Sequence, residues 1–311
     1  MTQNAHDALA ISLPTENALP AFEDWWPLIL NGIEQQLEDE LPSPGVPPSR
    51  LHEAMRYAVL NPGKRLRPLL CHASGTAFDA PAQALDIVGA ALEMAHVGSL
   101  VYDDLPAMDN DHLRHGRPTL HIQFDEVTAI LTSTALLAQA FTALNYVPLP
   151  AARKALLMAE FAVAIGSQGM CGGQMLDLSS QGVALDSTAL EHMHQMKTGA
   201  LIRASVRMGA LCAQASVPSL NELDRYAAAI GLAFQVVDDI LDVTQDSAAL
   251  GKTAGKDARD HKPTYVSLLG LEPSRNLVRQ LNEQAHIALV NFDFRAIYLH
   301  DLADLIVNRL R

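Results

Sequence analysis

The chain has 311 residues, of which 49% are apolar and 18% charged, a composition typical of a globular protein with a large core. The formal net charge of −13 argues against nucleic acid as a partner, because phosphate backbones select basic surfaces. The first twenty residues have neither a basic start nor a continuous apolar run, so we expect a short disordered tail over 1–20 rather than a signal peptide.

Helical periodicity dominates the chain, and no Asn-Gly or Asp-Gly hairpin signal lies between alternating strands. We expect a helical C-terminus preceded by helices over 22–41, 48–60, 66–78, 83–104, 120–145, 150–167, 187–213, 220–243 and 262–270. Prolines and glycines predict breaks at 43–48, 61–63, 147–151, 171–173 and 271–274. Because no linker divides this pattern, the sequence predicts one all-α domain, a large helical bundle over 21–311.

One apolar stretch has the length of a membrane span, since Val127–Ala152 contains no charged residue. It nevertheless contains Thr128, Ser133 and Gln139, so we interpret it as a buried central helix and expect no membrane span.

The cysteines indicate a reducing compartment. Cys71, Cys171 and Cys212 are odd in number, far apart and form no Cys-x-x-Cys pair. We therefore expect reduced thiols in a cytoplasmic protein.

An acidic cluster follows the apolar run near residue 100, in LVYDDLPAMDND (100–111). Carboxylates almost never enter a core unpaired, so this cluster is either a solvated helix end or a site for a positive charge. A straight helix would turn Asp109 away from Asp103, because six residues rotate by about 600°. The interruption at Pro106 is expected to fold the chain so that Asp109 returns towards Asp103.

A second acidic cluster lies in FQVVDDILD (234–242), where Gln235, Asp238, Asp239 and Asp242 share one helix face at i, i+3, i+4 and i+7. Aspartates at this spacing repel on a bare surface but are favourable around a hard divalent cation. Two such clusters predict one cavity that holds several Mg²⁺, whose remaining ligands are water and a bridging substrate diphosphate.

Basic residues recur beside loops and acidic motifs, which indicates a phosphate pocket. They are Lys64, Arg65 and Arg67 in NPGKRLRP (61–68), Arg114 and Arg117 in RHGRPT (114–119), and Lys197, Lys252, Lys256 and Lys262.

The segments GKRLRP, DDLPAMD, MKTGAL, FQVVDDILD and LGKTAGKD resemble the signature regions of the trans-isoprenyl diphosphate synthases. They are most similar to those of short-chain bacterial farnesyl and geranylgeranyl diphosphate synthases. The resemblance implies an all-α bundle of the isoprenoid synthase type around a central cavity, usually as a homodimer. It also implies a transferase that condenses isopentenyl diphosphate with allylic diphosphates (dimethylallyl, geranyl or farnesyl) by Mg²⁺-assisted ionisation.

The resemblance also implies roles for individual residues. The ligands of three Mg²⁺ would be Asp103, Asp104, Asp109, Asp238, Asp239 and Asp242. The allylic diphosphate would be bound by Arg114, Lys197, Thr198, Gln235 and Lys252, and isopentenyl diphosphate by Lys64, Arg67 and His96. Outside this resemblance, His96 is interpreted as an ordinary helix histidine.

Two departures from the family pattern carry predictions. The family usually has two adjacent arginines after the first acidic motif, whereas this chain has Arg114 and His115, so isopentenyl diphosphate is expected to bind more weakly. Farnesyl-producing members commonly place a bulky aromatic four or five residues before the first aspartate, where this chain has Ser99 and Gly98. The product is therefore predicted to be farnesyl or geranylgeranyl diphosphate, with geranylgeranyl favoured.

Two alternatives stay open on sequence grounds. A class I terpene cyclase ionises the same diphosphate but typically replaces the second aspartate motif with an Asn/Ser/Glu triad and lacks an isopentenyl site. A non-catalytic subunit of a heteromeric prenyl synthase would be marked by loss of the aspartates. This chain keeps both motifs, and His115 is the only substitution that favours the inactive subunit.

Overall fold

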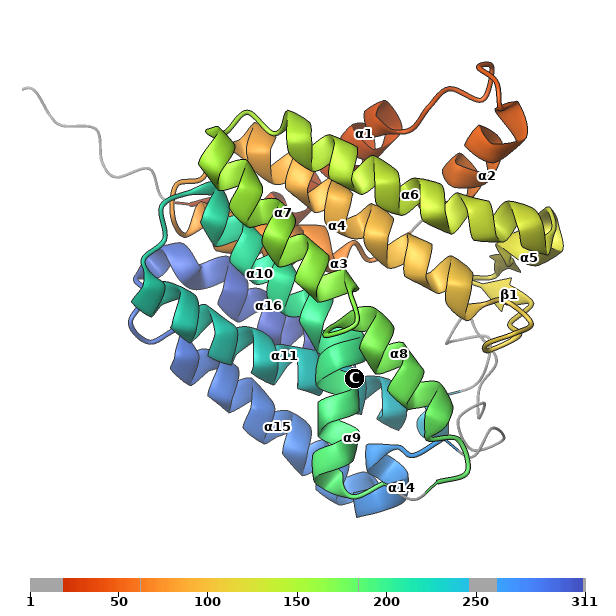
Figure 1. The fold of residues 1–311 in the computed structure, drawn as a ribbon. Helices are drawn as coiled ribbons and strands as arrows, with labels where there is room; N and C mark the ends of the chain where they lie inside the picture. The colour runs from red at the N-terminus through yellow and green to blue at the C-terminus, as the bar shows by residue number, and fades with distance from the viewer. Residues whose placement is uncertain (1–18, 62, 184, 246–261, 310–311) are drawn as a thin grey trace, which may run out of the picture.

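The structure, a computed structural model, describes residues 19–61, 63–183, 185–245 and 262–309. Helices account for nearly all of the regular structure, which confirms the all-α class (Figure 1). The helices are α1 (Phe22–Glu40), α2 (Ser49–Val59), α3 (Leu66–Thr76), α4 (Ala82–Asp103), α5 (Leu120–Gln123), α6 (Glu126–Tyr146), α7 (Ala151–Ile165), α8 (Met170–Ser179), α9 (Ser187–His194), the π-helical turn η1 (Gln195–Gly199), α10 (Ala200–Cys212), α11 (Val217–Thr244), α14 (Tyr265–Leu269), α15 (Leu271–Ala288), the 3-10 turn η2 (Phe294–Ala296) and α16 (Ile297–Asn308).

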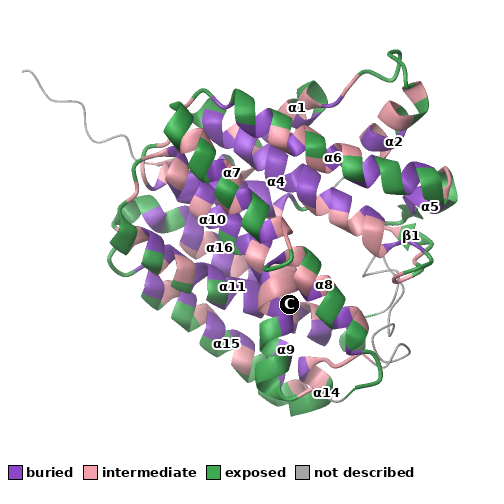
Figure 2. Ribbon diagram, viewed as in Figure 1, coloured by how far each residue is buried: buried purple, intermediate pink, exposed green. Residues whose placement is uncertain are grey.

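Two large apolar clusters hold these helices together. One packs α3, α10, α11, α15 and α16 around the fully buried Tyr226, and the other packs α1, α4, α6, α7 and α10 around the fully buried Phe161. Burying one such side chain contributes about 1.5–3 kcal/mol. Because α10 belongs to both clusters, it ties the two halves of the bundle together, and α4 is buried along most of its length (Figure 2).

The uncharged stretch forms α6, but α6 is not the buried central helix that the sequence suggested. Val127, Ile130 and Leu131 are 67%, 45% and 53% exposed, so one apolar face of α6 points outward. Three segments are long and apolar enough to cross a membrane: Ala82–Asp103, Glu126–Tyr146 and Ala151–Ser179, with 78%, 44% and 28% of their most apolar windows buried. The absence of a membrane span therefore stays a prediction.

Three predicted breaks or runs differ in the structure. The Cys-Gly-Gly segment at 171–173 lies in the first turn of α8 instead of separating two helices. A Cβ on Gly173 would lie 2.1 Å from the backbone nitrogen of Lys197, so the missing side chain lets α8 approach η1. The segment 271–274 opens α15, where Pro273 lies in the first turn and needs no hydrogen-bonded N–H. The run 120–145 is divided at Asp125, whose side chain caps α6.

A short hairpin, which the sequence did not predict, follows the first acidic cluster. Its strands β1 (Leu113–Arg114) and β2 (Arg117–Pro118) pair in antiparallel fashion. The turn residues His115 and Gly116 both have positive φ, at 50° and 75°, which is the conformation that Asn-Gly turns usually supply. Histidine also tolerates it, so His-Gly acts as the hairpin turn here.

The predicted N-terminal tail lies outside the described residues up to residue 18. At its end, Leu19 packs against the core and the Pro20 carbonyl accepts a hydrogen bond of 2.8 Å from Tyr298 Oη. Lys252 and Lys256 also lie outside the described residues.

Candidate active site

A cavity of about 850 Å³ is lined by residues from the C-terminal end of α4, from the helices α8 and α11, and from the β1–β2 hairpin. The predicted site residues that line it are Lys64, Arg67, His96, Ser99, Asp103, Asp104, Arg114, His115, Lys197, Thr198, Gln235 and Asp238. The described residues Gly98, Asp109, Asp239 and Asp242 do not line it. The structure thus brings both acidic motifs to one cavity, through Asp103 and Asp104 from the first and Asp238 from the second.

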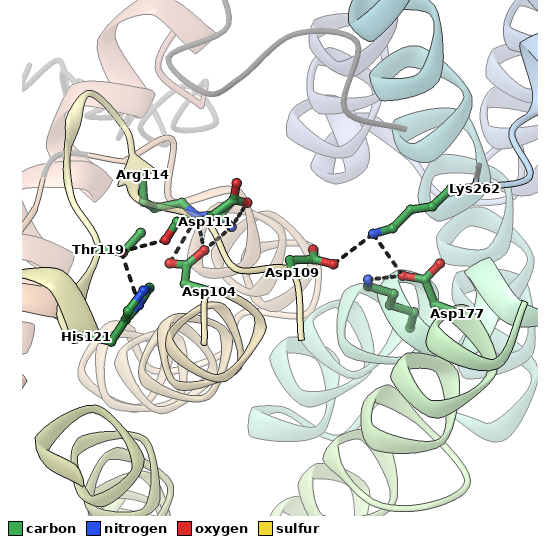
Figure 3. A network of polar contacts seen from close by, with 9 residues as sticks. Asp104, Asp109, Asp111, Arg114, Thr119, His121, Asp177 and Lys262 are labelled. Carbon is green, nitrogen blue, oxygen red and sulfur yellow. Dashed lines mark hydrogen bonds and ion pairs between the residues drawn. The ribbon is translucent and has the colours of Figure 1, made fainter. Parts of the chain in front are cut away.

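The first acidic cluster turns back on itself as the sequence predicted. The backbone nitrogen of Asp109 donates to the carbonyl of Asp103 at 2.9 Å. Asp104 is 4% exposed, and Arg114 Nη2 donates to its Oδ1 at 2.5 Å and lies 3.6 Å from Asp111 (Figure 3). Burial raises the pKa of Asp104 to about 6 even though Arg114 opposes that shift, and burial likewise raises the pKa of Asp103.

An aspartate that sequence reasoning missed joins this cluster to two lysines. Asp177 is 5% exposed and accepts a 2.5 Å hydrogen bond from Lys197 Nζ. Lys262 Nζ lies 3.7 Å from the same carboxylate and donates to Asp109 at 3.0 Å (Figure 3). Burial alone would raise the pKa of Asp177, but the two lysines outweigh it and the pKa is lowered. The sequence signals this residue only weakly, because Asp177 is a single aspartate that follows the predicted break at 171–173.

The turn that carries Lys197 and Thr198 is a π-helical turn, a feature that often marks functional positions. Gly199 lies against α11, where a Cβ on Gly231 would be 3.2 Å from the Gly199 Cα. This close approach brings Thr198 Oγ1 within 3.3 Å of Gln235 Oε1, to which it donates.

Within the second acidic cluster, Asp238 is paired with the C-terminal part of the chain. Arg309 Nη2 donates to Asp238 Oδ1 at 2.7 Å, and the guanidinium lies 4.7 Å from the centre of the Phe234 ring. Arg309 also lines the cavity. Sequence reasoning missed it, because nothing near the C-terminus signals that α16 returns to α11.

The other two carboxylates of this cluster are buried beside the cavity. Asp239 accepts from Gln235 Nε2 at 3.1 Å and from the Tyr265 backbone nitrogen at 2.8 Å. Asp242 is 5% exposed, and its Oδ2 has no hydrogen-bond partner among the described residues. Of the three aspartates in this cluster that were expected to face the cavity, only Asp238 does so.

One corner of the cavity gathers basic side chains. Burial lowers the pKa of Arg67 to about 10, and its Nε has no partner among the described residues. Burial, followed by the charge of Arg67, lowers the pKa of His96 well below its usual range. Burial is also the largest cause of the lowered pKa of Lys64 and of His115. An anion in this corner would relieve all four shifts.

Two other basic candidates have structural partners. Arg65 borders the cavity, but its guanidinium is held by Glu34 at 2.8 Å and by the buried Glu93 at 3.0 Å. Arg117 lies outside the cavity, 4.2 Å from the centre of the Tyr57 ring.

The two predicted chain-length residues separate in the structure. A Cβ on Gly98 would meet the Ser133 carbonyl and hydroxyl oxygens at 3.4 Å, so Gly98 faces α6 rather than the cavity. Ser99 lines the cavity, and its hydroxyl donates to the His96 carbonyl at 2.7 Å. The apolar side of the cavity is completed by Leu137, Ile165 and Met170.

The described residues contain no group of three or more His, Cys, Asp or Glu side chains placed to hold a metal ion. The donor chemistry nevertheless fits Mg²⁺, which prefers oxygen and takes only one or two protein carboxylates. Three of the six aspartates predicted to bind Mg²⁺ contact a cationic side chain, which shows that positive charge is favoured at these positions. The pairs are Asp104 with Arg114, Asp109 with Lys262, and Asp238 with Arg309.

Comparisons with known proteins agree with this geometry. The polyprenyl synthetase family model matches residues 48–290. The chain is 50% identical over 258 residues to a probable farnesyl diphosphate synthase of Bradyrhizobium diazoefficiens, covering 82% of this chain and 78% of that protein. It is 47% identical over 264 residues to farnesyl diphosphate synthase of Escherichia coli, covering 83% and 88%.

A solved structure supports the same relationship. The fold matches geranyltransferase of Helicobacter pylori, solved in complex with magnesium and isoprenyl diphosphate, with a TM-score of 0.81 and 31% identity. The match covers 94% of this chain and 99% of that one.

Proposed function

Because the chain belongs to the polyprenyl synthetase family of prenyltransferases, we propose that it condenses isopentenyl diphosphate with an allylic diphosphate. The observation that carries this proposal is one cavity lined both by the carboxylates Asp103 and Asp238 and by the basic corner of Lys64 and Arg67. Two diphosphate sites in one cavity are what a condensation of two diphosphates requires.

In the proposed reaction the allylic diphosphate lies beside Lys197, Thr198 and Arg114, whose N–H and O–H groups donate to its oxygens. The isopentenyl partner lies against Lys64, Arg67 and His96. The carbon–oxygen bond of the allylic substrate breaks, and the isopentenyl double bond attacks the resulting cation while apolar walls exclude water. The departing diphosphate takes the proton, so no side-chain base is needed.

Asp103, Asp104 and Asp238 at the cavity wall would hold Mg²⁺, with Asp109, Asp239 and Asp242 behind them, and we keep three ions as the expected number. The bound ions would supply positive charge to the leaving diphosphate. The ions would compete with Arg309 for Asp238 and with Lys262 for Asp109.

The test is turnover of both diphosphates with and without Mg²⁺. Asp103→Asn and Asp238→Asn should each lower kcat by orders of magnitude while the circular dichroism spectrum is unchanged, and excess EDTA should abolish activity. Asp39→Asn, at an exposed position on α1, is the matched control and should keep wild-type rates. Full activity in EDTA contradicts the proposal.

For product length we propose the twenty-carbon geranylgeranyl diphosphate, supported by the small Ser99 on the cavity wall. The fifteen-carbon farnesyl product is the second candidate, favoured by the names of the Bradyrhizobium diazoefficiens and Escherichia coli relatives. Incubation with excess isopentenyl diphosphate and mass analysis of the products separates the two.

We also propose a cytoplasmic homodimer. The apolar outer faces of α6 and α7, with Val127, Ile130, Leu131, Leu156 and Val163 exposed, support self-association. Three free thiols support a reducing compartment. Sedimentation equilibrium tests the dimer, and Ile130→Glu together with Leu131→Glu should give a monomer.

A further inference from the structure

Away from the cavity, α15 and α16 bring two histidines into contact. The Nδ1 atoms of His286 and His300 are 2.5 Å apart, the ring planes differ by 11°, and the ring centres are 4.8 Å apart. These values describe two rings that lie edge to edge in nearly one plane with their Nδ1 atoms facing. One Nδ1 must therefore donate a proton that the other accepts.

The surroundings orient one of these rings. His286 Nε2 donates to Asp304 Oδ1 at 2.9 Å, and Asn282 Nδ2 donates to the same oxygen at 2.8 Å. A proton on Nε2 leaves the Nδ1 of a neutral His286 as a lone-pair donor. On each helix the partners are four residues apart, Asn282 with His286 and His300 with Asp304, so each pair lies on one helix face.

The charge state at neutral pH suits a cationic ligand. Burial, followed by the neighbouring His286, lowers the pKa of His300, which favours its neutral form. Burial would raise the pKa of Asp304, but the hydrogen bonds from Asn282 and His286 outweigh it. The side chains of His286 and Asp304 are 32% and 50% exposed and border a hollow of about 570 Å³, so an ion can enter from water.

We propose that His286 and His300 bind a divalent transition-metal ion of the Zn²⁺ class through their two Nδ1 atoms. The ion takes the place of the shared proton at the Nδ1 of His300, and that ring takes up a proton at Nε2 instead, so both imidazoles stay neutral and no net proton is released. Water completes the coordination. Zn–N bonds of about 2.0–2.1 Å in tetrahedral geometry place the two nitrogens roughly 3.3 Å apart. To reach that spacing from 2.5 Å, the two rings have to move apart and turn until both Nδ1 lone pairs point at the ion.

Asp304 then acts on the metal through His286, because a carboxylate on the far ring nitrogen raises the basicity of a ligating imidazole. The site selects against Mg²⁺, which prefers oxygen ligands. Bound metal would cross-link α15 to α16, the helix that leads to Arg309 and its contact with Asp238.

The test is thermal unfolding with Zn²⁺ or with EDTA, in saturating Mg²⁺ so that the aspartates of the cavity are occupied. Zn²⁺ should raise the Tm of the wild type and of His192→Gln, which changes an exposed histidine on α9, but not that of His300→Gln. In calorimetry Asp304→Asn should weaken Zn²⁺ binding about 10- to 100-fold.

No rise of the wild-type Tm with Zn²⁺, or an equal rise in His300→Gln, overturns the proposal. If His300→Gln does not fold, the pH profile decides, because protons compete for the same nitrogens. Zn²⁺ affinity of the wild type should then fall as pH drops from 7.5 to 5.5, about tenfold or more. A pH-independent affinity would exclude histidine ligation.

Discussion

Asp177→Asn tests whether the buried aspartate of α8 positions the lysines of the site. The substitution keeps the size and one acceptor oxygen but removes the negative charge that faces Lys197 at 2.5 Å and Lys262 at 3.7 Å. Breaking a fully buried ion pair costs about 3–5 kcal/mol. Because the Lys197 side chain is 22% exposed and Asn still accepts a hydrogen bond, we expect about 2 kcal/mol.

The pH dependence identifies the group that is responsible. The folded pKa of Asp177 is lowered, so its stabilisation is present above the unfolded value of about 3.9 and is lost as pH falls through the lower folded value. The stability gap between wild type and Asp177→Asn should be constant from pH 7 to pH 5 and should shrink below about pH 4. Asp104, with a pKa of about 6, titrates in both proteins, so its contribution cancels in the difference between their stabilities.

The assay is urea unfolding across this pH range, with steady-state kinetics at pH 7. We expect kcat/KM for the allylic diphosphate to fall about tenfold, while the KM for isopentenyl diphosphate is spared. Lys197→Met combined with Asp177→Asn should lose less stability than the two single changes added together. Equal stability of wild type and Asp177→Asn at pH 7, or strictly additive effects, would refute the reasoning.

Three further expectations follow from single contacts. His115→Arg should lower the KM for isopentenyl diphosphate. In the wild type, that KM should rise as pH climbs through the pKa of His115, which burial lowers below about 6.5. The Arg variant should lose this pH dependence. Arg309→Ala should lower the Mg²⁺ concentration for half-maximal rate about two- to tenfold, because a partly exposed pair to Asp238 is worth about 0.5–1.4 kcal/mol. Ser99→Tyr should shorten the main product to fifteen carbons on mass analysis, whereas Gly98→Ala should not, since that position faces α6.

Sequence periodicity located most helices, because an apolar stripe repeats wherever a helix packs on the core. It missed α8 for a physical reason: Gly172 and Gly173 disfavour a helix in isolation, and only the close contact with η1 makes them useful there. It also missed the hairpin, because a histidine at positive φ has no strong signature in composition. At α8, tertiary packing overrode the local propensity.

The acidic motifs could be predicted because several aspartates directly beside apolar helical runs are unusual unless they bind a positive charge, and this pattern is visible in the sequence alone. Their partners were not, since ion pairs such as Lys262 with Asp109 and Arg309 with Asp238 join residues far apart in the chain. Gly98 was misplaced for a related reason. One step along α4 rotates a side chain by about 100°, which separates the cavity-facing Ser99 from the α6-facing Gly98.

The ion pairs around the cavity set a condition on how the proposed substrates bind. Asp104, Asp109 and Asp238 each have a cationic side chain in contact, so a metal ion that joins Asp109 or Asp238 competes with Lys262 or Arg309 and favours their release. A buried cation freed from its carboxylate is costly unless another anion takes its place. A diphosphate supplies that anion, since its oxygens accept from Lys and Arg. Metal and diphosphate should therefore bind cooperatively: Mg²⁺ alone should bind weakly in calorimetry, and inorganic diphosphate should strengthen its binding by tenfold or more, about 1.4 kcal/mol.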